Sequence, residues 1–341
     1  MYCDHNATAP ISATVRSAVA GAMETAWGNP SSPHREGQAA AVRVEYARRQ
    51  VADLVGVAPK HVLFTSGATE ANAWVLSGAS PRVIASATEH PSVLSWATET
   101  VEVDEHGQIR LEALRTLLQE GPAVVSVMAA NNETGVLQPI HDVKRICEEF
   151  GSTYHCDATQ VPGRMSVEVV ADWTTLSAHK FGGPRGVGAL VSSSPPPALF
   201  RGGEQERGHR AGTLNVPGIV GFGVAASEAR VMSSVERDKL EAFCRERGAH
   251  IVGGDAPRLP NTLSVLFSAP GDMIVAGLDL RGVHASTGSA CSSGSSQPSH
   301  VLTAMGLAGT PVRFSFGHGS RAEPIIEVLQ NVLDDMGVVC V

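Results

Sequence analysis

Several features that mark other protein classes are missing from this sequence. No apolar run approaches the length of a membrane span, and the first ten residues, MYCDHNATAP, lack the basic-then-apolar pattern of a secretory signal. The net charge is −8 and no basic run stands out, which argues against a nucleic-acid partner. The composition therefore predicts a cytoplasmic protein that binds neither membranes nor nucleic acid.

Clustered cysteines are missing too. The chain has six cysteines and no CxxC pair, so neither a disulfide framework nor a zinc ribbon is indicated, and no metal site is expected. Scattered free thiols fit a reducing compartment. The six are Cys3, Cys147, Cys156, Cys244, Cys291 and Cys340.

What is present indicates an α/β fold with two parts. The 341 residues are 43% hydrophobic and 18% charged, as in an ordinary globular protein with room for two lobes. Short apolar runs alternate with amphipathic segments, which predicts a mostly parallel sheet with helices on both faces. We expect a large domain over residues 12–225, and a smaller α+β domain from residues 1–11 and 226–341. The expected strands are HVLFTSG, PRVIASA, AVVSVMAA, YHCDATQ and TTLSAHK, with helices at Leu111–Gln119, Ile140–Phe150, Val235–Gly248 and Glu323–Met336.

Polar residues end all five expected strands. Because ligands bind at the carboxyl ends of the strands in such sheets, we expect these polar residues to converge on one site. The general polarity of loops would explain one polar strand ending, but it hardly explains five. The endings are residues 65–69, Glu89-His90, Asn131-Asn132-Glu133, residues 157–160 and residues 177–180.

Two of these residues indicate a cofactor. A strand-end lysine, Lys180, is suited to nucleophilic or Schiff-base chemistry when burial lowers its pKa, although an exposed turn lysine is the ordinary alternative. Asp157 would be a buried carboxylate that needs a cation, such as a pyridinium nitrogen. Strand alternation puts Cys156 on the opposite face from His155 and Asp157, which disfavours a metal site and makes Cys156 a core residue.

The remaining features complete that cofactor's requirements. SGATEAN places Thr69 at the opening of a helix, where backbone N–H groups suit a phosphate, although a helix cap is common there. His90 could stack on a planar ring or simply cap a turn. GGPRGVG precedes a strand, so it does not match a dinucleotide-binding motif. Together these residues favour pyridoxal phosphate (PLP), an electron sink for a carbanion at an amino acid's Cα.

One more stretch, STGSACSSG, sets Cys291 among small polar residues where a thiol can neither pack in a core nor escape oxidation. The stretch predicts a flexible loop that carries a reactive thiol.

Over nearly its whole length the sequence resembles the cysteine desulfurases, in the class V aminotransferase branch of fold-type I PLP enzymes. The matching motifs are GNPSSPH, FTSGATEAN, TEHPSV, NNETGVLQPI, HCDATQ, SAHKFGGPRGVGAL, ERGHRAGT, STGSACSSG, QPSHVL and VRFSFG. The resemblance implies a seven-stranded PLP sheet, a homodimer, L-cysteine as substrate and alanine as product. SACSSG followed by PSHVL is similar to the group that supplies sulfur for iron–sulfur cluster assembly or thiolation, through an acceptor or scaffold protein.

The resemblance also implies the role of each matching residue. Lys180 would bind PLP covalently, Asp157 would pair with the ring nitrogen, and His90 would stack on the ring and assist proton transfer. Cys291 would attack the substrate sulfur and keep it as a persulfide. The implied phosphate contacts are Ala68, Thr69, Ser177, His179 and, from the partner subunit, Thr213; the ring-oxygen contacts are Asn132 and Gln160; and the substrate contacts are Arg313, Asn132 and Asn29.

Two alternatives stay open at this point. A related PLP enzyme, such as a selenocysteine lyase, would not need Cys291, and a non-catalytic subunit of a sulfur-transfer complex would bind no cofactor. Compared with the family, the chain is shortened between Asn72 and Pro81 and between Gly306 and Arg313, which puts docking to a standard scaffold in doubt. For Cys340, near the end of the sequence, a sulfur relay is one alternative, and a terminal thiol without a role is the expectation.

Overall fold

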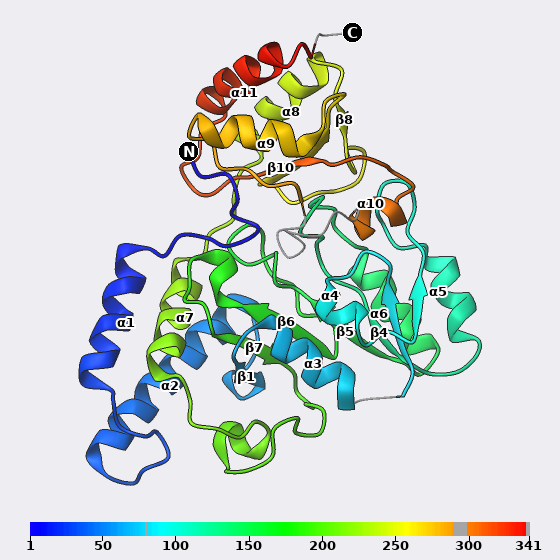
Figure 1. Cartoon of the computed structure of the whole chain (residues 1–341). Coiled ribbons are helices and arrows are strands. Elements are labelled where there is room, and N and C mark those ends of the chain that lie inside the picture. The colour runs from blue at the N-terminus through cyan, green and yellow to red at the C-terminus, as the bar shows by residue number, and fades with distance from the viewer. Residues whose placement is uncertain (79–80, 289–298, 339–341) are drawn as a thin grey trace.

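A large central sheet organises most of the chain. The computed structural model describes residues 1–78, 81–288 and 299–338, and in these the sheet has seven strands in the order β1-β7-β6-β5-β4-β2-β3 (Figure 1). All neighbouring strands are parallel except at β7, which is antiparallel to both β1 and β6. The strands are β1 Val62–Thr65, β2 Val83–Ser86, β3 Glu99–Val101, β4 Val124–Ser126, β5 Thr153–Asp157, β6 Trp173–Ser177 and β7 Gly188–Val191.

Helices cover both faces of this sheet. Along β1, Val62 and Phe64 pack into a core with α2, α5, α6 and α7, while the intervening Leu63 packs into a second core with α3 and α4. This alternation is the two-residue period of a strand buried on both sides. The helices are α1 Ala13–Thr25, α2 Arg35–Val55, α3 Ala68–Gly78, α4 Pro91–Leu94, α5 Leu111–Leu118, α6 Ile140–Glu149 and α7 Val216–Glu228. The predicted α/β fold is confirmed.

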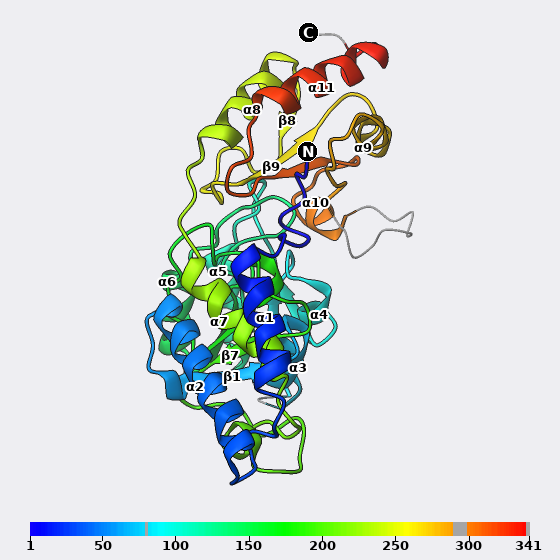
Figure 2. The same ribbon diagram turned by 90° about the vertical axis from the view of Figure 1, so that its left-hand side faces the viewer.

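A smaller α+β lobe stands beyond one edge of the large part (Figure 2). Its antiparallel sheet has the order β10-β9-β8, and the N-terminal strip joins it through bridges from Tyr2 to His284 and from Asp4 to Ser315. Cys3 lies in this lobe's own core. The elements are α8 Val235–Glu246, β8 His250–Ile251, β9 Thr262–Leu266, α9 Gly271–Leu280, α10 His300–Ala304, β10 Val312–Ser315 and α11 Glu323–Asp335. The boundaries at residues 12 and 225 stay a prediction.

The predicted elements correspond closely to the observed ones. The five expected strands are β1, β2, β4, β5 and β6, and the four expected helices are α5, α6, α8 and α11. Several elements had no counterpart among those expectations, including the short strands β3 and β8 and the helices α1, α4, α7 and α10. Within the described ranges, no helix combines the length and the apolar character that crossing a membrane requires.

Candidate active site

The principal cavity, about 820 Å³, opens at the carboxyl ends of the parallel strands, between the large sheet and the small lobe. All five polar strand endings contribute to its lining, as the sequence predicted. The N-terminal strip adds Asn6, Ala7 and Thr8, and the small lobe adds Ser299, His300 and Arg313. Segments that are far apart in the sequence therefore meet around one space.

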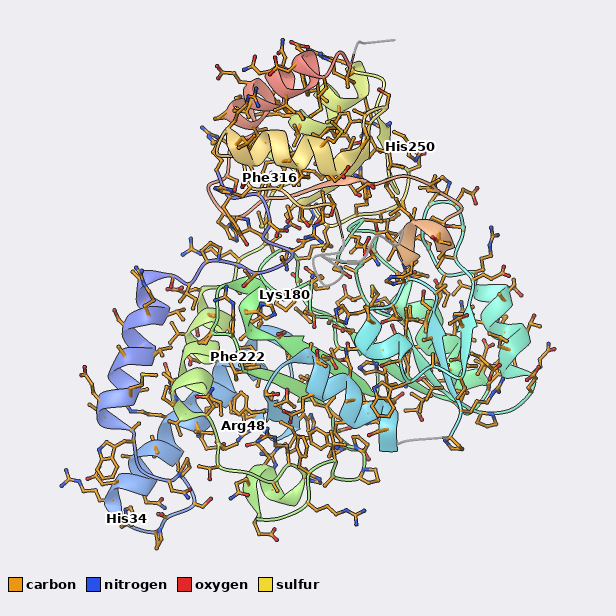
Figure 3. The ribbon with its side chains drawn as sticks, in the orientation of Figure 1. His34, Arg48, Lys180, Phe222, His250 and Phe316 are labelled. Atoms are coloured by element: carbon orange, nitrogen blue, oxygen red, sulfur yellow. The ribbon has the colours of Figure 1, made fainter. Side chains whose placement is uncertain are left out.

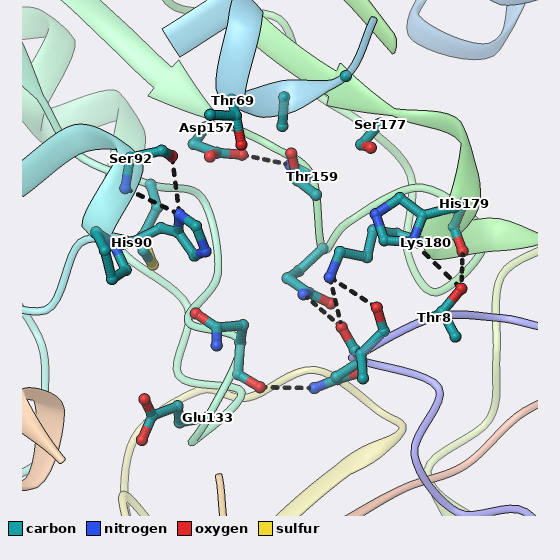
Figure 4. Close-up of a pocket in the computed structure, with 18 of the residues that line it drawn as sticks. Thr8, Thr69, His90, Ser92, Glu133, Asp157, Thr159, Ser177, His179 and Lys180 are labelled. Carbon is teal, nitrogen blue, oxygen red and sulfur yellow. Dashed lines mark hydrogen bonds between the residues drawn. The ribbon is translucent and has the colours of Figure 1, made fainter. Parts of the chain in front are cut away.

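Lys180 lies in the middle of this region (Figure 3). It follows β6 in a short 3₁₀ turn, Ala178–Phe181, and its Nζ donates to the carbonyl oxygens of Asn6 at 2.9 Å and Ala7 at 3.0 Å (Figure 4). The amine is half-buried and is held against the cavity by the N-terminal strip. It is in a position to react with a molecule in that cavity.

Asp157 ends β5, and its carboxylate is held from both sides. Thr159 donates its backbone N–H to Oδ1 at 3.0 Å, and Asn72 on α3 donates its Nδ2 to Oδ2 at 2.9 Å. The same amide also donates to Ser92 Oγ at 3.0 Å, and that hydroxyl lies 2.8 Å from His90 Nδ1. A continuous hydrogen-bond chain therefore joins the carboxylate to the His90 ring.

His90 caps the short helix α4 with its ring. Its Nδ1 accepts the backbone N–H of Ser92 at 3.1 Å, so the neutral ring carries its proton on Nε2. Burial lowers the pKa of His90, and the Lys180 charge adds to this while the Asp157 charge opposes it. The ring is therefore neutral at pH 7, and it lines the cavity.

The start of α3 forms one end of the cavity. Ser66, Gly67, Ala68 and Thr69 line it, and a Cβ at Gly67 would meet no atom within 4 Å, so the space before this turn is open. Ser177 and His179 face the same end (Figure 4). Burial, helped by the charges of Lys180, Arg185 and Arg164, lowers the pKa of His179 to about 4. Backbone N–H groups and hydroxyls at a helix start, with the cations Lys180 and Arg185 in the same lining, suit an anionic group.

Arg313 on β10 forms the opposite end. It is 1% exposed, and its guanidinium donates to the carbonyl oxygens of Asn132 at 3.0 Å and of Gly288, and to Asp4 Oδ1 at 2.6 Å. Its Nε is buried without a hydrogen-bond partner among the described residues. This end therefore presents a guanidinium that is paired with Asp4 and keeps one N–H unbonded among the described residues, and a guanidinium suits a carboxylate.

Two predicted site residues do not line this cavity within a single chain. Thr213 is exposed, and Asn29 is exposed in the connection between α1 and α2, at the far end of the large part (Figure 1). Cys291 lies outside the described residues, as does Cys340. The other ten predicted residues all line the cavity: Ala68, Thr69, His90, Asn132, Asp157, Gln160, Ser177, His179, Lys180 and Arg313.

Comparison with known proteins identifies the family. Residues 1–328 match the Aminotransferase class-V family. A cysteine desulfurase of Cereibacter sphaeroides is 38% identical, over 98% of this chain and 96% of its own length. A cysteine desulfurase IscS of Anaeromyxobacter is 37% identical, over 98% of this chain and 92% of its own length. A solved structure titled NifS-like protein superposes with a TM-score of 0.88 and 32% identity, over 99% of this chain and all of its own.

The chain belongs to the class-V aminotransferases, in their cysteine desulfurase branch. Enzymes of this family use PLP, and the lining of the cavity fits that group. A lysine amine, a buried carboxylate and an anion-binding helix start are all present. Thr159 Oγ1 and Gln160 Oε1 also lie in the lining, buried and without a hydrogen-bond partner among the described residues. A polar ligand would satisfy both atoms.

Sequence reasoning missed the residues that hold the predicted ones in place. Asn72 and Ser92 position the Asp157 carboxylate and the His90 ring, and the carbonyl groups of Asn6 and Ala7 hold Lys180. The SGATEAN and TEHPSV motifs contain Asn72 and Ser92, so the signal was present, but the spacing alone gives no reason to connect two helices. No group of three metal-ligating side chains occurs among the described residues.

Proposed function

We propose that this protein is a PLP-dependent enzyme that converts L-cysteine to L-alanine and passes the sulfur through a persulfide on Cys291. The observation that supports this most is the cavity that brings together Lys180, Asp157 and Arg313 in a chain of this family. When bound, the cofactor supplies an electron sink for negative charge at the substrate's Cα.

Each end of the cavity has its own task in this proposal. Asp157 pairs with the cofactor's ring nitrogen, and its two hydrogen bonds from Asn72 and Thr159 keep the carboxylate oriented. The His90 ring lies against the cofactor, and the N–H groups from Ser66 to Thr69, with Ser177 and His179, hold the phosphate. The neutral His179 ring gains a favourable partner when the phosphate group binds.

Substrate recognition relies on the opposite end. Arg313 and Asn132 bind the carboxylate of L-cysteine, because a fixed guanidinium recognises a planar anion well. Lys180 binds the cofactor and moves the Cα proton, with His90 beside it as a second proton carrier. Asn6 and Ala7 keep the lysine amine close to the cavity when it is not engaged.

The sulfur step requires an ionised thiol. The Cys291 thiolate attacks the substrate sulfur, so that a sulfur–sulfur bond forms as the carbon–sulfur bond breaks, and the carbon takes a proton to become the methyl group of alanine. Burial raises the pKa of Cys3 and of Cys147 to about 12, and raises those of Cys156 and Cys244 further. These thiols stay protonated at pH 7 and do not compete.

We further propose a homodimer that passes sulfur to an acceptor for iron–sulfur cluster assembly or thiolation. The end of α1, the following connection and α2 expose large apolar side chains, which are Met23, Trp27, Val42 and Tyr46. Burying these in a second copy of the chain would explain them. Thr213 and Asn29 would then complete the partner's cavity. Free buried cysteines fit a cytoplasmic location.

Anaerobic turnover of L-cysteine with a reductant tests the proposal. The wild type should form alanine and sulfide in equal amounts, and Cys291→Ala should lose nearly all of both. Cys340→Ala is the matched control and should keep its rate. A Cys291→Ala enzyme that retains turnover would favour the lyase alternative, and a wild type without a cofactor absorbance band would favour the non-catalytic one.

A further inference from the structure

One carboxylate in the cavity lining has no cationic partner. Glu133 lies in the connection after β4, is 2% exposed and lines the cavity. The two other carboxylates of the lining are compensated, since Asp157 receives two hydrogen bonds and Glu70 pairs with Arg210 at 2.8 Å. Within the described residues no ion pair involves Glu133. A buried carboxylate without a cation is costly to keep, which directs attention to its effect on a ligand.

Hydrogen bonds from both lobes fix the position of Glu133. Its backbone N–H donates to Asn131 Oδ1 at 2.9 Å, and the Asn131 amide donates to the carbonyl oxygen of Thr88 at 2.9 Å. From the small lobe, Ser299 Oγ donates to Glu133 Oε2 at 2.6 Å. Ser299 is also the N-cap of α10, so the donor is itself held in place. The carboxylate therefore has one defined position at the boundary between the lobes.

One oxygen of this carboxylate is left for the cavity. Oε2 carries the bond from Ser299, and the backbone of Gly288 passes close to it, because a Cβ there would lie 3.1 Å away. Oε1 accepts no hydrogen bond from the described residues, and it is not among the enclosed atoms that lack a partner. Figure 4 shows the Glu133 carboxylate on the side of the cavity away from Ser177. Oε1 is thus an accessible acceptor in the lining.

The cations of the lining all have other tasks in the proposed function. Among the described residues these cations are Lys180, Arg185 and Arg313. Lys180 binds the cofactor, and Arg185 lies near His179 at the phosphate end, where its charge helps to lower the pKa of that ring. Arg313 receives the carboxylate attached to the substrate's Cα. A second carboxylate on a ligand would therefore meet Glu133 and no unassigned cation.

The side chain of a bound amino acid faces the part of the lining that contains Glu133. With the carboxylate at Arg313 and the amine near Lys180, the side chain is the one remaining group to be placed. His90 and Glu133 lie across the cavity from Lys180 (Figure 4). On the same side, the His300 ring is bound through Nε2 to a backbone carbonyl oxygen at 2.8 Å. Glu133 is the one carboxylate among these three described residues.

We propose that Glu133 determines substrate specificity by rejecting amino acids with an anionic side chain, such as L-aspartate and L-cysteine sulfinate, an inference that depends on the proposed function. At an effective dielectric constant of about 20, two like charges about 6 Å apart weaken binding about 10²-fold. The neutral thiol of L-cysteine carries no charge and escapes this repulsion. Rejection by a fixed like charge is a recognised route to specificity.

The first test compares L-aspartate with L-asparagine, which have nearly the same shape and differ by one charge. Neither carries a sulfur that the enzyme could remove. Titration of the holoenzyme, followed by the absorbance of the bound cofactor, gives a Kd for each. The wild type should bind L-asparagine about 10–100-fold more tightly than L-aspartate, and Glu133→Gln should reduce this preference to about threefold or less. An equal preference in wild type and Glu133→Gln would overturn the proposal.

Matched variants separate charge from shape and from distance. Glu133→Asp keeps the charge and should keep most of the wild-type preference. Glu70→Gln removes a carboxylate from the opposite end of the same lining and should leave the preference as it is. Equal effects of Glu133→Gln and Glu70→Gln would assign the preference to the overall charge of the cavity and overturn the role of Glu133. Glu133→Leu, which adds no unpaired amide, gives the same comparison if the glutamine variant does not fold.

The second test is turnover of L-cysteine sulfinate. In this substrate the carbon–sulfur bond breaks with its electron pair left on carbon, the carbon takes a proton to give alanine, and the sulfur leaves as sulfur dioxide, which water converts to sulfite. In Glu133→Gln, kcat/KM for the sulfinate relative to that for L-cysteine should rise about 10–100-fold. An unchanged ratio would contradict the proposal. Failure of the proposed function is separate, since a wild type that forms no alanine from L-cysteine could still show the difference between L-aspartate and L-asparagine.

Discussion

Removing Arg48 should destabilise the large part of the protein far more than an ordinary surface change does. Arg48, on α2, is 3% exposed and makes a two-pronged ion pair with Glu206, with donor–acceptor distances of 2.8 and 2.7 Å. Glu206 also accepts the backbone N–H of Phe64 at 2.7 Å, and Arg48 donates to the carbonyl of Val62 at 2.8 Å. The pair therefore attaches a distant loop to strand β1.

The expected cost follows from these contacts. Arg48→Met removes the cation and leaves the Glu206 carboxylate buried with one backbone donor, and breaking a buried pair in this way costs about 3–5 kcal/mol. Glu206 and Arg207 also have positive φ angles, 47° and 60°, which residues with side chains tolerate only when their surroundings hold them. We therefore expect a loss of unfolding free energy of about 4 kcal/mol for Arg48→Met.

A double-mutant cycle in urea measures this. The variants are Arg48→Met, Glu206→Gln and the two combined. The double variant should lose at least about 2 kcal/mol less unfolding free energy than the sum of the losses in the two single variants, because the second change removes a group that is already unpaired. Arg115→Met, which breaks an exposed pair with Glu149, is the control and should change little. Additive losses, or a loss below about 1 kcal/mol for Arg48→Met, would refute the assigned role of the pair.

Two further predictions concern the cavity. Glu89→Gln should become more stabilising as the pH rises from 5 to 8, because burial raises the pKa of Glu89 in the fold well above its value in the unfolded chain. Each pH unit between these two pKa values costs the wild type up to about 1.4 kcal/mol of unfolding free energy. Urea unfolding across this range checks it, and a difference that does not vary with pH would contradict it. Arg313→Lys keeps the charge near Asp4 but loses the planar fork, so kcat/KM for L-cysteine should fall about 10–100-fold, mainly through KM. An unchanged KM would remove Arg313 from carboxylate binding.

The convergence of the site was predictable because it depends on topology. Consecutive parallel strands end at one edge of the sheet, so their polar endings must meet, and Lys180 and Asp157 lie in the same cavity for that reason. Alternation along β5 also predicted correctly that Cys156 points into the core. Such inferences need only the period of a strand and the order of the chain.

The support of the site was not predictable, because it comes from contacts between distant segments. Asn72 and Asp157 are joined across 85 positions, and Arg48 and Glu206 across 158. Backbone carbonyls that hold Lys180 leave no signal in a sequence at all. The antiparallel direction of β7 likewise follows from the short connection after Lys180, not from its composition.

The distribution of thiols follows from the proposed chemistry. A protein that carries a persulfide exposes its own cysteines to sulfur exchange, and exchange needs a thiolate. The described cysteines are buried, and a thiol with a pKa of about 12, as for Cys3 and Cys147, is ionised in only about one molecule in 10⁵ at pH 7. Burial thus keeps these sulfurs unreactive without removing them from the core.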